Sequence, residues 1–192
     1  MKRDELRNWS RKQVLTIKDL WKDKASIIIG VSLGIALFFG ISYIKGIAVM
    51  AALAAIGAVS LLYNRAIRVS LGIELVMMGT VITGLLYGTI PAAVVGVVSL
   101  FFAFLFTAHF THATFVSFIA IIAVSFLVPV FSGMGITWAG IILTVIYDAI
   151  IAAGYLFLGS RVERTILFIA THIAFNVWVF TSVAPRIYGL LA

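Results

Sequence analysis

After Lys24 the chain continues for 168 residues with only nine charged side chains, and just three of these are acidic: Glu74, Asp148 and Glu163. About 20 apolar residues span the hydrocarbon core of a bilayer, where a charged side chain costs roughly 3 kcal/mol or more. Charged residues make up 11% of the chain, whereas a soluble domain normally carries about a quarter. The sequence therefore predicts an integral membrane protein, in which Glu74 and Asp148 lie inside apolar segments.

Residues 1–24 form a polar and strongly basic N-terminal segment, with eight of the fourteen lysines and arginines of the chain. Its apolar side chains, including Trp9 and Trp21, recur at helical spacing and share one face, while most of its charges lie elsewhere. Tryptophan on one face and basic residues on the others suit the headgroup plane of a bilayer. We predict a basic amphipathic cytoplasmic helix over residues 1–24; a solvated helical extension is the alternative.

Seven apolar runs follow, each close to the length that crosses a bilayer. They are apolar on every face, which excludes the alternating strands of a membrane barrel, and helices satisfy their own backbone hydrogen bonds in lipid. We therefore predict an all-α transmembrane helix bundle of seven spans, one plus six, forming a single domain over residues 25–192. The runs cover about 25–44, 46–63, 69–87, 91–108, 114–131, 137–158 and 165–184.

The basic residues between these runs predict the orientation of the bundle. Cytoplasmic loops of membrane proteins carry an excess of lysine and arginine. If the basic N-terminus is cytoplasmic, seven crossings leave only Lys45 and Arg186 outside. We therefore expect a multi-pass protein of the cell membrane with its N-terminus in the cytoplasm. The loop residues then on the cytoplasmic side are Arg65, Arg68, His109, His112, Arg161 and Arg164.

The sixth and seventh runs carry polar residues that we expect to meet. His172 and Asn176 are four residues apart and so share a helix face. Because the two helices are consecutive and antiparallel, Asp148 and His172 fall at similar depths, and a hydrogen bond between them is expected. Glu74 is expected about five residues into the third helix. The candidate ligand-binding residues are Asp148, His172, Asn176, Thr144, Tyr147 and Glu74.

These polar residues have two interpretations. One is a pocket between helices that binds a small solute or relays protons. The other is structural, because polar side chains also hydrogen-bond across transmembrane helices merely to hold them together, at about 0.6 kcal/mol each.

Several function classes have no signature in the sequence. There is no cysteine, which excludes disulfides, thiolate catalysis and cysteine-bound metals. Walker A, HExxH, GxSxG and dinucleotide-binding motifs are absent, and Asp148 lacks a second intramembrane aspartate. His109 and His112 have no neighbouring carboxylate or cysteine and are poor evidence for a metal site, so we expect them to be solvated loop residues. We expect no enzymatic activity, no cofactor and, because the basic residues follow membrane topology, no nucleic-acid partner.

Small residues mark one helix as a candidate for close contact with another. The second run contains alanines four residues apart, which form a ridge that permits tight helix packing in lipid. Internal packing explains such a ridge, and docking of a partner subunit is the competing use. The residues predicted to contact a partner helix are Ala51, Ala55 and Ala58.

Two stretches of the chain resemble the S component, the substrate-binding membrane subunit of energy-coupling factor transporters. Residues 46–63, GIAVMAALAAIGAVSLLY, look like its alanine-rich first helix. Residues 72–99, GIELVMMGTVITGLLYGTIPAAVVGVVS, look like its second and third helices, joined at Gly84-Leu85-Leu86-Tyr87-Gly88. Six helices from Gly46 onward also match the helix count of that family.

The resemblance implies a protein that binds a small solute in a helical bundle and acts with membrane partner subunits in transport. In that family the small-residue ridge contacts the coupling subunit. The run at 25–44 is additional to the family core, and positive-inside counting orients the core opposite to the family. The rod-shape protein MreD has a similar helical texture, so a scaffolding subunit with no solute site is the alternative.

Overall fold

The computed structural model describes residues 29, 31–35, 40, 41, 43–67, 71–108 and 110–192. The chain divides into two compact units, residues 1–46 and residues 47–192, and the second contains the candidate site. The amphipathic helix predicted over residues 1–24 lies outside the described residues, as does much of the run at 25–44. The described residues contain helices, turns and connecting segments but no strand.

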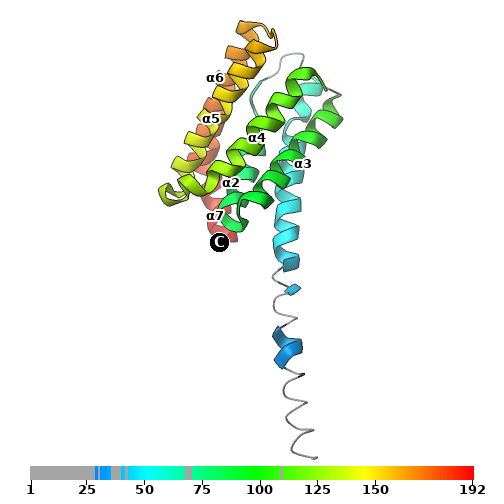
Figure 1. The fold of residues 1–192 in the computed structure, drawn as a ribbon, viewed down its shortest axis with the longest axis vertical. Coiled ribbons are helices and arrows are strands. Elements are labelled where there is room, and N and C mark those ends of the chain that lie inside the picture. The colour runs from blue at the N-terminus through cyan, green and yellow to red at the C-terminus, as the bar shows by residue number, and fades with distance from the viewer. Residues whose placement is uncertain (1–28, 30, 36–39, 42, 68–70, 109) are drawn as a thin grey trace, which may run out of the picture. The chain divides into compact units, whose positions relative to one another are not determined.

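The second unit is a bundle of helices joined by short connections (Figure 1). A first helix ends at residue 60 and is followed by the 3-10 turn η1, Leu62–Arg65. The next three helices are α2 (Val76–Tyr87), α3 (Thr89–Thr107) and α4 (His112–Phe131). After the 3-10 turn η2 (Ser132–Met134) comes α5 (Gly135–Phe157). The last helical stretch joins α6 (Val162–Trp178), the π-helical turn η3 (Val179–Val183) and α7 (Ala184–Leu191).

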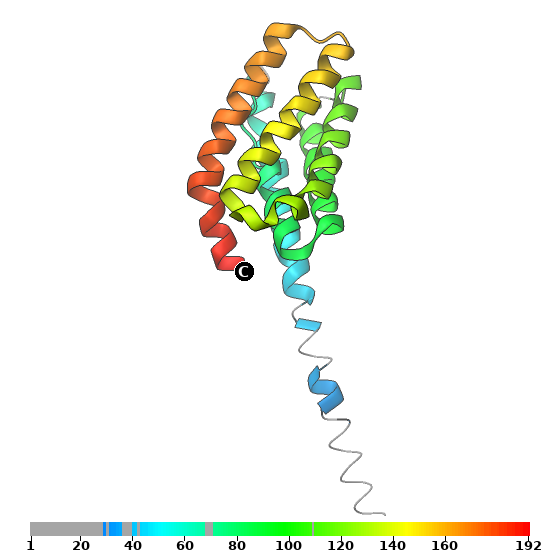
Figure 2. The same cartoon turned by 60° about the vertical axis from the view of Figure 1, so that its left-hand side comes forward.

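Within the described part of the chain, four helical stretches are long and apolar enough to cross a membrane: Tyr43–Arg65, Thr89–Thr107, His112–Phe157 and Val162–Leu191. The third contains both α4 and α5, which turn back at η2 and lie side by side (Figures 1 and 2). The 12 residues of α2 extend only about 18 Å, less than the 30 Å hydrocarbon core. These helices confirm the prediction of an all-helical membrane protein. The count of seven spans stays a prediction.

Two predicted boundaries are wrong. Residues 43–60 are helical, so Lys45 does not lie in a break between two helices. Alanine and lysine are both good helix formers, and nothing in this sequence stops the helix. The third run was expected to be helical from residue 69, but α2 begins at Val76 and residues 71–74 are not helical. Glu74 therefore lies before α2 and not inside a helix. Its carboxylate accepts a hydrogen bond from the backbone N–H of Val76, the first residue of α2, at 2.7 Å.

Helix α2 forms the centre of the bundle. Every residue from 76 to 84 is buried, and the helix packs against α3, α4 and α5. Small residues allow this close packing: a Cβ at Gly79 would lie 3.3 Å from the carbonyl oxygen of Leu53, and one at Gly84 would lie 2.8 Å from a methyl of Val128. A centrally buried α2 fixes the position of the segment immediately before it, which contains Glu74.

The alanine ridge does not form one surface. Ala51 and Ala55 are exposed, whereas Ala58 is 3% exposed and lies in the interior. Ala58 shares its helix face with Ala54, which belongs to the buried core, because residues four apart lie on the same side of a helix. The prediction that Ala58 contacts a partner helix is therefore wrong, while Ala51 and Ala55 remain available for such a contact.

Candidate functional site

Glu74, His172 and Asp148, which we call the buried trio, join three parts of the chain. Nδ1 of His172 lies 2.8 Å from Oδ1 of Asp148, and Nε2 lies 2.9 Å from Oε1 of Glu74. All three side chains are buried. Asp148 is nine residues before the end of α5 and His172 ten residues after the start of α6, so both lie about 15 Å from that end of the bundle. For a 30 Å hydrocarbon core that begins at that end of the bundle, this distance is about half the depth.

The segment 71–75 carries Glu74 into the bundle and is held by side chains from two helices. The N–H of Gly72 donates to Oγ1 of Thr171 at 2.8 Å, and the N–H of Leu75 donates to Oγ of Ser60 at 2.9 Å. The Tyr63 hydroxyl donates to the carbonyl of Leu71. These bonds supply partners for backbone groups that no helix or strand satisfies.

Gly72 brings this segment directly against α6. A Cβ placed on Gly72 would lie 2.2 Å from Cβ of His172 and 2.5 Å from its Cα. No side chain fits in that space, so only glycine allows the backbone to approach the helix this closely. The approach places Glu74, two residues later, within hydrogen-bonding distance of the imidazole.

The contacts of the imidazole define the proton content of the trio. A neutral imidazole has one N–H and can donate to only one carboxylate. With the fewest protons, the two close carboxylate contacts are satisfied either by an imidazolium that donates to both, or by a neutral imidazole that donates to one carboxylate and accepts from one protonated carboxyl. Both arrangements leave one net negative charge on the three side chains. In either arrangement the trio is a buried anionic group with one proton in each of its two nitrogen–oxygen contacts.

Two aromatic rings enclose His172. The ring of Phe168 stacks on the imidazole with centroids 5.4 Å apart and an interplanar angle of 12°. The ring of Tyr147 lies 5.3 Å away at 41°. Such packing fixes the orientation of the imidazole and favours a positive charge on it, because ring faces carry negative electrostatic potential.

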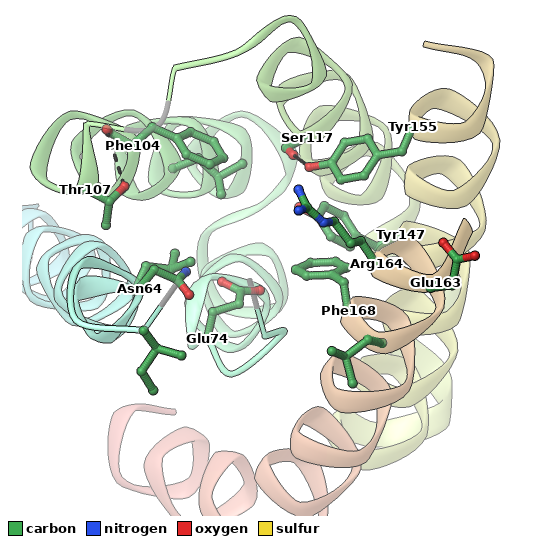
Figure 3. Close-up of a pocket in the computed structure, with 14 residues that line it drawn as sticks. Asn64, Glu74, Phe104, Thr107, Ser117, Tyr147, Tyr155, Glu163, Arg164 and Phe168 are labelled. Atoms are coloured by element: carbon green, nitrogen blue, oxygen red, sulfur yellow. Dashed lines mark hydrogen bonds between the residues drawn. The ribbon is translucent and has the colours of Figure 1, made fainter. Parts of the chain in front are cut away.

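A cavity of about 480 Å³ lies beside the trio and includes Glu74, Tyr147 and Phe168 in its wall (Figure 3). Polar groups on other sides are Asn64, Thr107 and the hydrogen-bonded pair of Ser117 and Tyr155, whose oxygens are 2.9 Å apart. Glu163 and Arg164, both exposed, border it at the start of α6. The remaining lining side chains are apolar: Leu61, Ile67, Leu100, Phe104 and Leu167.

The structure brings together some of the predicted site residues but not all. The expected hydrogen bond between Asp148 and His172 is present. Glu74 and Tyr147 line the cavity, whereas Asp148 and His172 stand behind them and do not border it.

Thr144 and Asn176 also lie outside the cavity wall. The Thr144 hydroxyl donates to the carbonyl of Gly140 at 2.8 Å, and the Asn176 amide donates to the carbonyl of His172 at 3.1 Å. Each of these side chains thus bonds to its own helix, and Oδ1 of Asn176 is buried with no partner among the described residues. The prediction that Thr144 and Asn176 contact a solute therefore has no support in the cavity geometry.

Sequence reasoning missed three features of the site. It did not pair Glu74 with His172, from which it is 98 residues distant. The stacking of Phe168 on His172 could have been found, because residues four apart on a helix are neighbours. For the contact of Gly72 with α6, the sequence offers no indication other than the presence of a glycine at this position.

The candidate metal ligands outside the trio do not form a site. His112 is exposed at the start of α4, and His109 lies outside the described residues. Among the residues that the structure describes, no group of three or more histidine, cysteine or acidic side chains could hold a metal ion.

The chain matches no protein-family model, and no curated protein and no solved structure shows significant similarity to it. The geometry of the site therefore carries the functional argument alone.

Proposed function

We propose that the protein binds a small solute in the cavity beside Glu74 and acts with partner subunits in transport, as an S component does. The observation that carries this proposal is a buried carboxylate, 4% exposed, in the wall of a cavity of about 480 Å³. Small-molecule sites in proteins are typically cavities of about 300–1,000 Å³ with mostly apolar walls and a few placed polar groups. The cavity beside Glu74 has apolar side chains over much of its wall and a few polar groups.

A purely structural role for the trio does not explain the cavity beside it. Interhelical hydrogen bonds hold a bundle together without any cavity beside them, and packed interiors contain few voids larger than a water molecule. The trio also fixes Glu74 with one carboxylate oxygen on His172 and the other on the N–H of Val76. An arrangement that positions a carboxylate at a cavity wall is typical of a binding site whose polar groups are held in place.

The test is whether a solute remains bound when the protein is purified in mild detergent. Leu167 borders the cavity and is 42% exposed, while its neighbour Ile166 is 60% exposed and does not border it. We expect mass spectrometry of the denatured protein to release one solute from the wild type and from Ile166→Trp, and none from Leu167→Trp, because the indole fills the cavity. A scaffolding subunit would release no solute in any of the three preparations.

We also propose seven spans in the cell membrane with a cytoplasmic N-terminus, in which the first two spans meet before residue 43 and not at Lys45; this orientation places the cavity mouth on the cytoplasmic side. Because the chain has no cysteine, single cysteines can be introduced at positions 66, 160 and 186. We expect membrane-impermeant maleimide to label positions 66 and 160 only in inverted vesicles and position 186 only in intact cells. Labelling of positions 66 and 186 from the same side would disprove this topology.

A partner helix is proposed to dock on the exposed face of the first helix of the second unit, where Ala51 and Ala55 lie. Ala55→Leu should then reduce recovery of a co-purifying subunit while the melting temperature stays within a degree or two. Ala58→Leu is the matched buried change, and overpacking there should cost about 1–3 kcal/mol of stability. Unchanged subunit recovery with Ala55→Leu would argue against docking at this face.

A further inference from the structure

The cavity is bordered by opposite charges on different elements. Glu74, in the segment before α2, contributes the negative charge of the buried trio. Arg164, in the first turn of α6, contributes a guanidinium. Figure 3 shows this guanidinium directed toward Ser117 and Tyr155, across the cavity from Glu74, whereas Glu163 is drawn at the outer side of α6. The cavity is therefore bordered by a buried anionic wall and by an exposed edge that carries Glu163 and Arg164, of which Figure 3 shows the guanidinium on the cavity side.

Neither charge is neutralised by the other. The only ion pairs among the described residues are those within the trio, so Arg164 has no carboxylate within 4.0 Å. With the fewest protons that satisfy its two contacts, the trio keeps one net negative charge. The charge of the trio is buried beside apolar side chains and is costly unless it is paired, whereas Arg164 is exposed and available to an anion at the edge of the cavity. A bound molecule that supplies both counter-charges would satisfy both walls at once.

The surface between the two charges is aromatic and aliphatic. Phe104, Tyr147, Tyr155 and Phe168 border the cavity, and aliphatic side chains fill much of the rest. Aromatic walls favour a flat or apolar body, and ring faces add attraction for a cation. The volume of about 480 Å³ accommodates a molecule of metabolite size.

We propose that the solute is amphoteric: an aromatic or otherwise apolar body with an amine or other cationic donor that faces Glu74 and a carboxylate or other anion that faces Arg164. This inference rests on the proposed solute-binding function and specifies its ligand class. A simple cation would leave the guanidinium unpaired, and a simple anion would meet the negative charge of the trio. The guanidinium suits an anion well, because its N–H groups match carboxylate geometry.

Three matched compounds test this assignment on the purified full-length protein: 4-(aminomethyl)benzoate, 4-methylbenzylamine, which lacks the acid, and 4-methylbenzoate, which lacks the amine. Isothermal titration should show the amphoteric compound binding about tenfold tighter than either analogue, as expected for one additional charged hydrogen bond. Glu74→Gln should abolish its advantage over 4-methylbenzoate, and Arg164→Gln its advantage over 4-methylbenzylamine. Arg161→Gln is the control, because Arg161 is exposed and does not border the cavity.

The outcomes separate this inference from the proposed function. If either analogue binds as tightly as the amphoteric compound, or if Glu74→Gln and Arg164→Gln leave the preferences unchanged, the assignment is wrong. If none of the three compounds binds while a solute still co-purifies with the protein, the ligand class is wrong and solute binding stands. If none binds and nothing co-purifies, both are wrong.

Discussion

Replacing His172 with alanine is expected to lower the free energy of unfolding in detergent by about 3–5 kcal/mol, because it leaves two buried acids without their shared partner. His172 is fully buried and bonds to both Asp148 and Glu74. Removal of the imidazole also leaves a cavity between Tyr147 and Phe168, whose rings pack against it. The measurement is equilibrium or thermal unfolding of the purified variant beside the wild type.

A second variant shows whether the loss arises from unpaired acids. Adding Asp148→Asn to His172→Ala removes one of the two stranded carboxyl groups, so part of the lost stability should return. Contacting residues of this kind commonly couple by about 0.5–3 kcal/mol in a double-mutant cycle. His112→Ala is the histidine control, because His112 is exposed. Strictly additive effects of the two changes would contradict the trio.

Gly72→Ala is expected to destabilise the protein by about 3 kcal/mol or more, at the upper end of the range for overpacking. The new methyl would lie 2.2 Å from Cβ, 2.5 Å from Cα and 2.6 Å from the backbone nitrogen of His172. No rotamer change relieves contact with these atoms, so either the segment 71–75 or α6 must move. The movement would break the hydrogen bond from Gly72 to Thr171 and withdraw Glu74 from the imidazole.

The matched control is Gly189→Ala, in α7, where an added Cβ meets no atom within 4 Å. That change should be neutral or slightly stabilising, because alanine is the better helix former. A Gly72→Ala variant that unfolds like the wild type and still retains its solute would show that the segment does not pack on α6 as described.

The helical bundle could be predicted because it depends mainly on the length and polarity of apolar runs. The run at 91–108 corresponds to α3, and those at 114–131 and 137–158 correspond to α4 and α5 within two residues at each end. The start of α2 could not be predicted in this way. Its position is fixed by Thr171 and His172, which lie about a hundred residues further along the chain.

The site could be predicted only where local geometry decides it. Asp148 and His172 lie on consecutive antiparallel helices, so helix rise alone places them at one depth. Hydropathy predicts Glu74 about five residues into a helix. It does not reveal that residues 71–74 are not helical and carry Glu74 into the bundle. The cavity is likewise a product of packing among distant segments, and its aromatic lining has no periodic signal in the sequence.

The most direct measurement of the central claim compares wild type and Glu74→Gln for bound solute and for melting temperature in the same preparations. Glutamine retains the size of the side chain and one oxygen, which can accept from His172 or from the N–H of Val76 but not from both, and it removes the negative charge at the cavity wall. We predict that the solute-to-protein ratio falls at least about tenfold, as for loss of one charged hydrogen bond, while the melting temperature changes by a few degrees at most. Arg161→Gln, at an exposed residue that does not border the cavity, should retain the solute. A Glu74→Gln protein that loses stability but no solute would contradict the account.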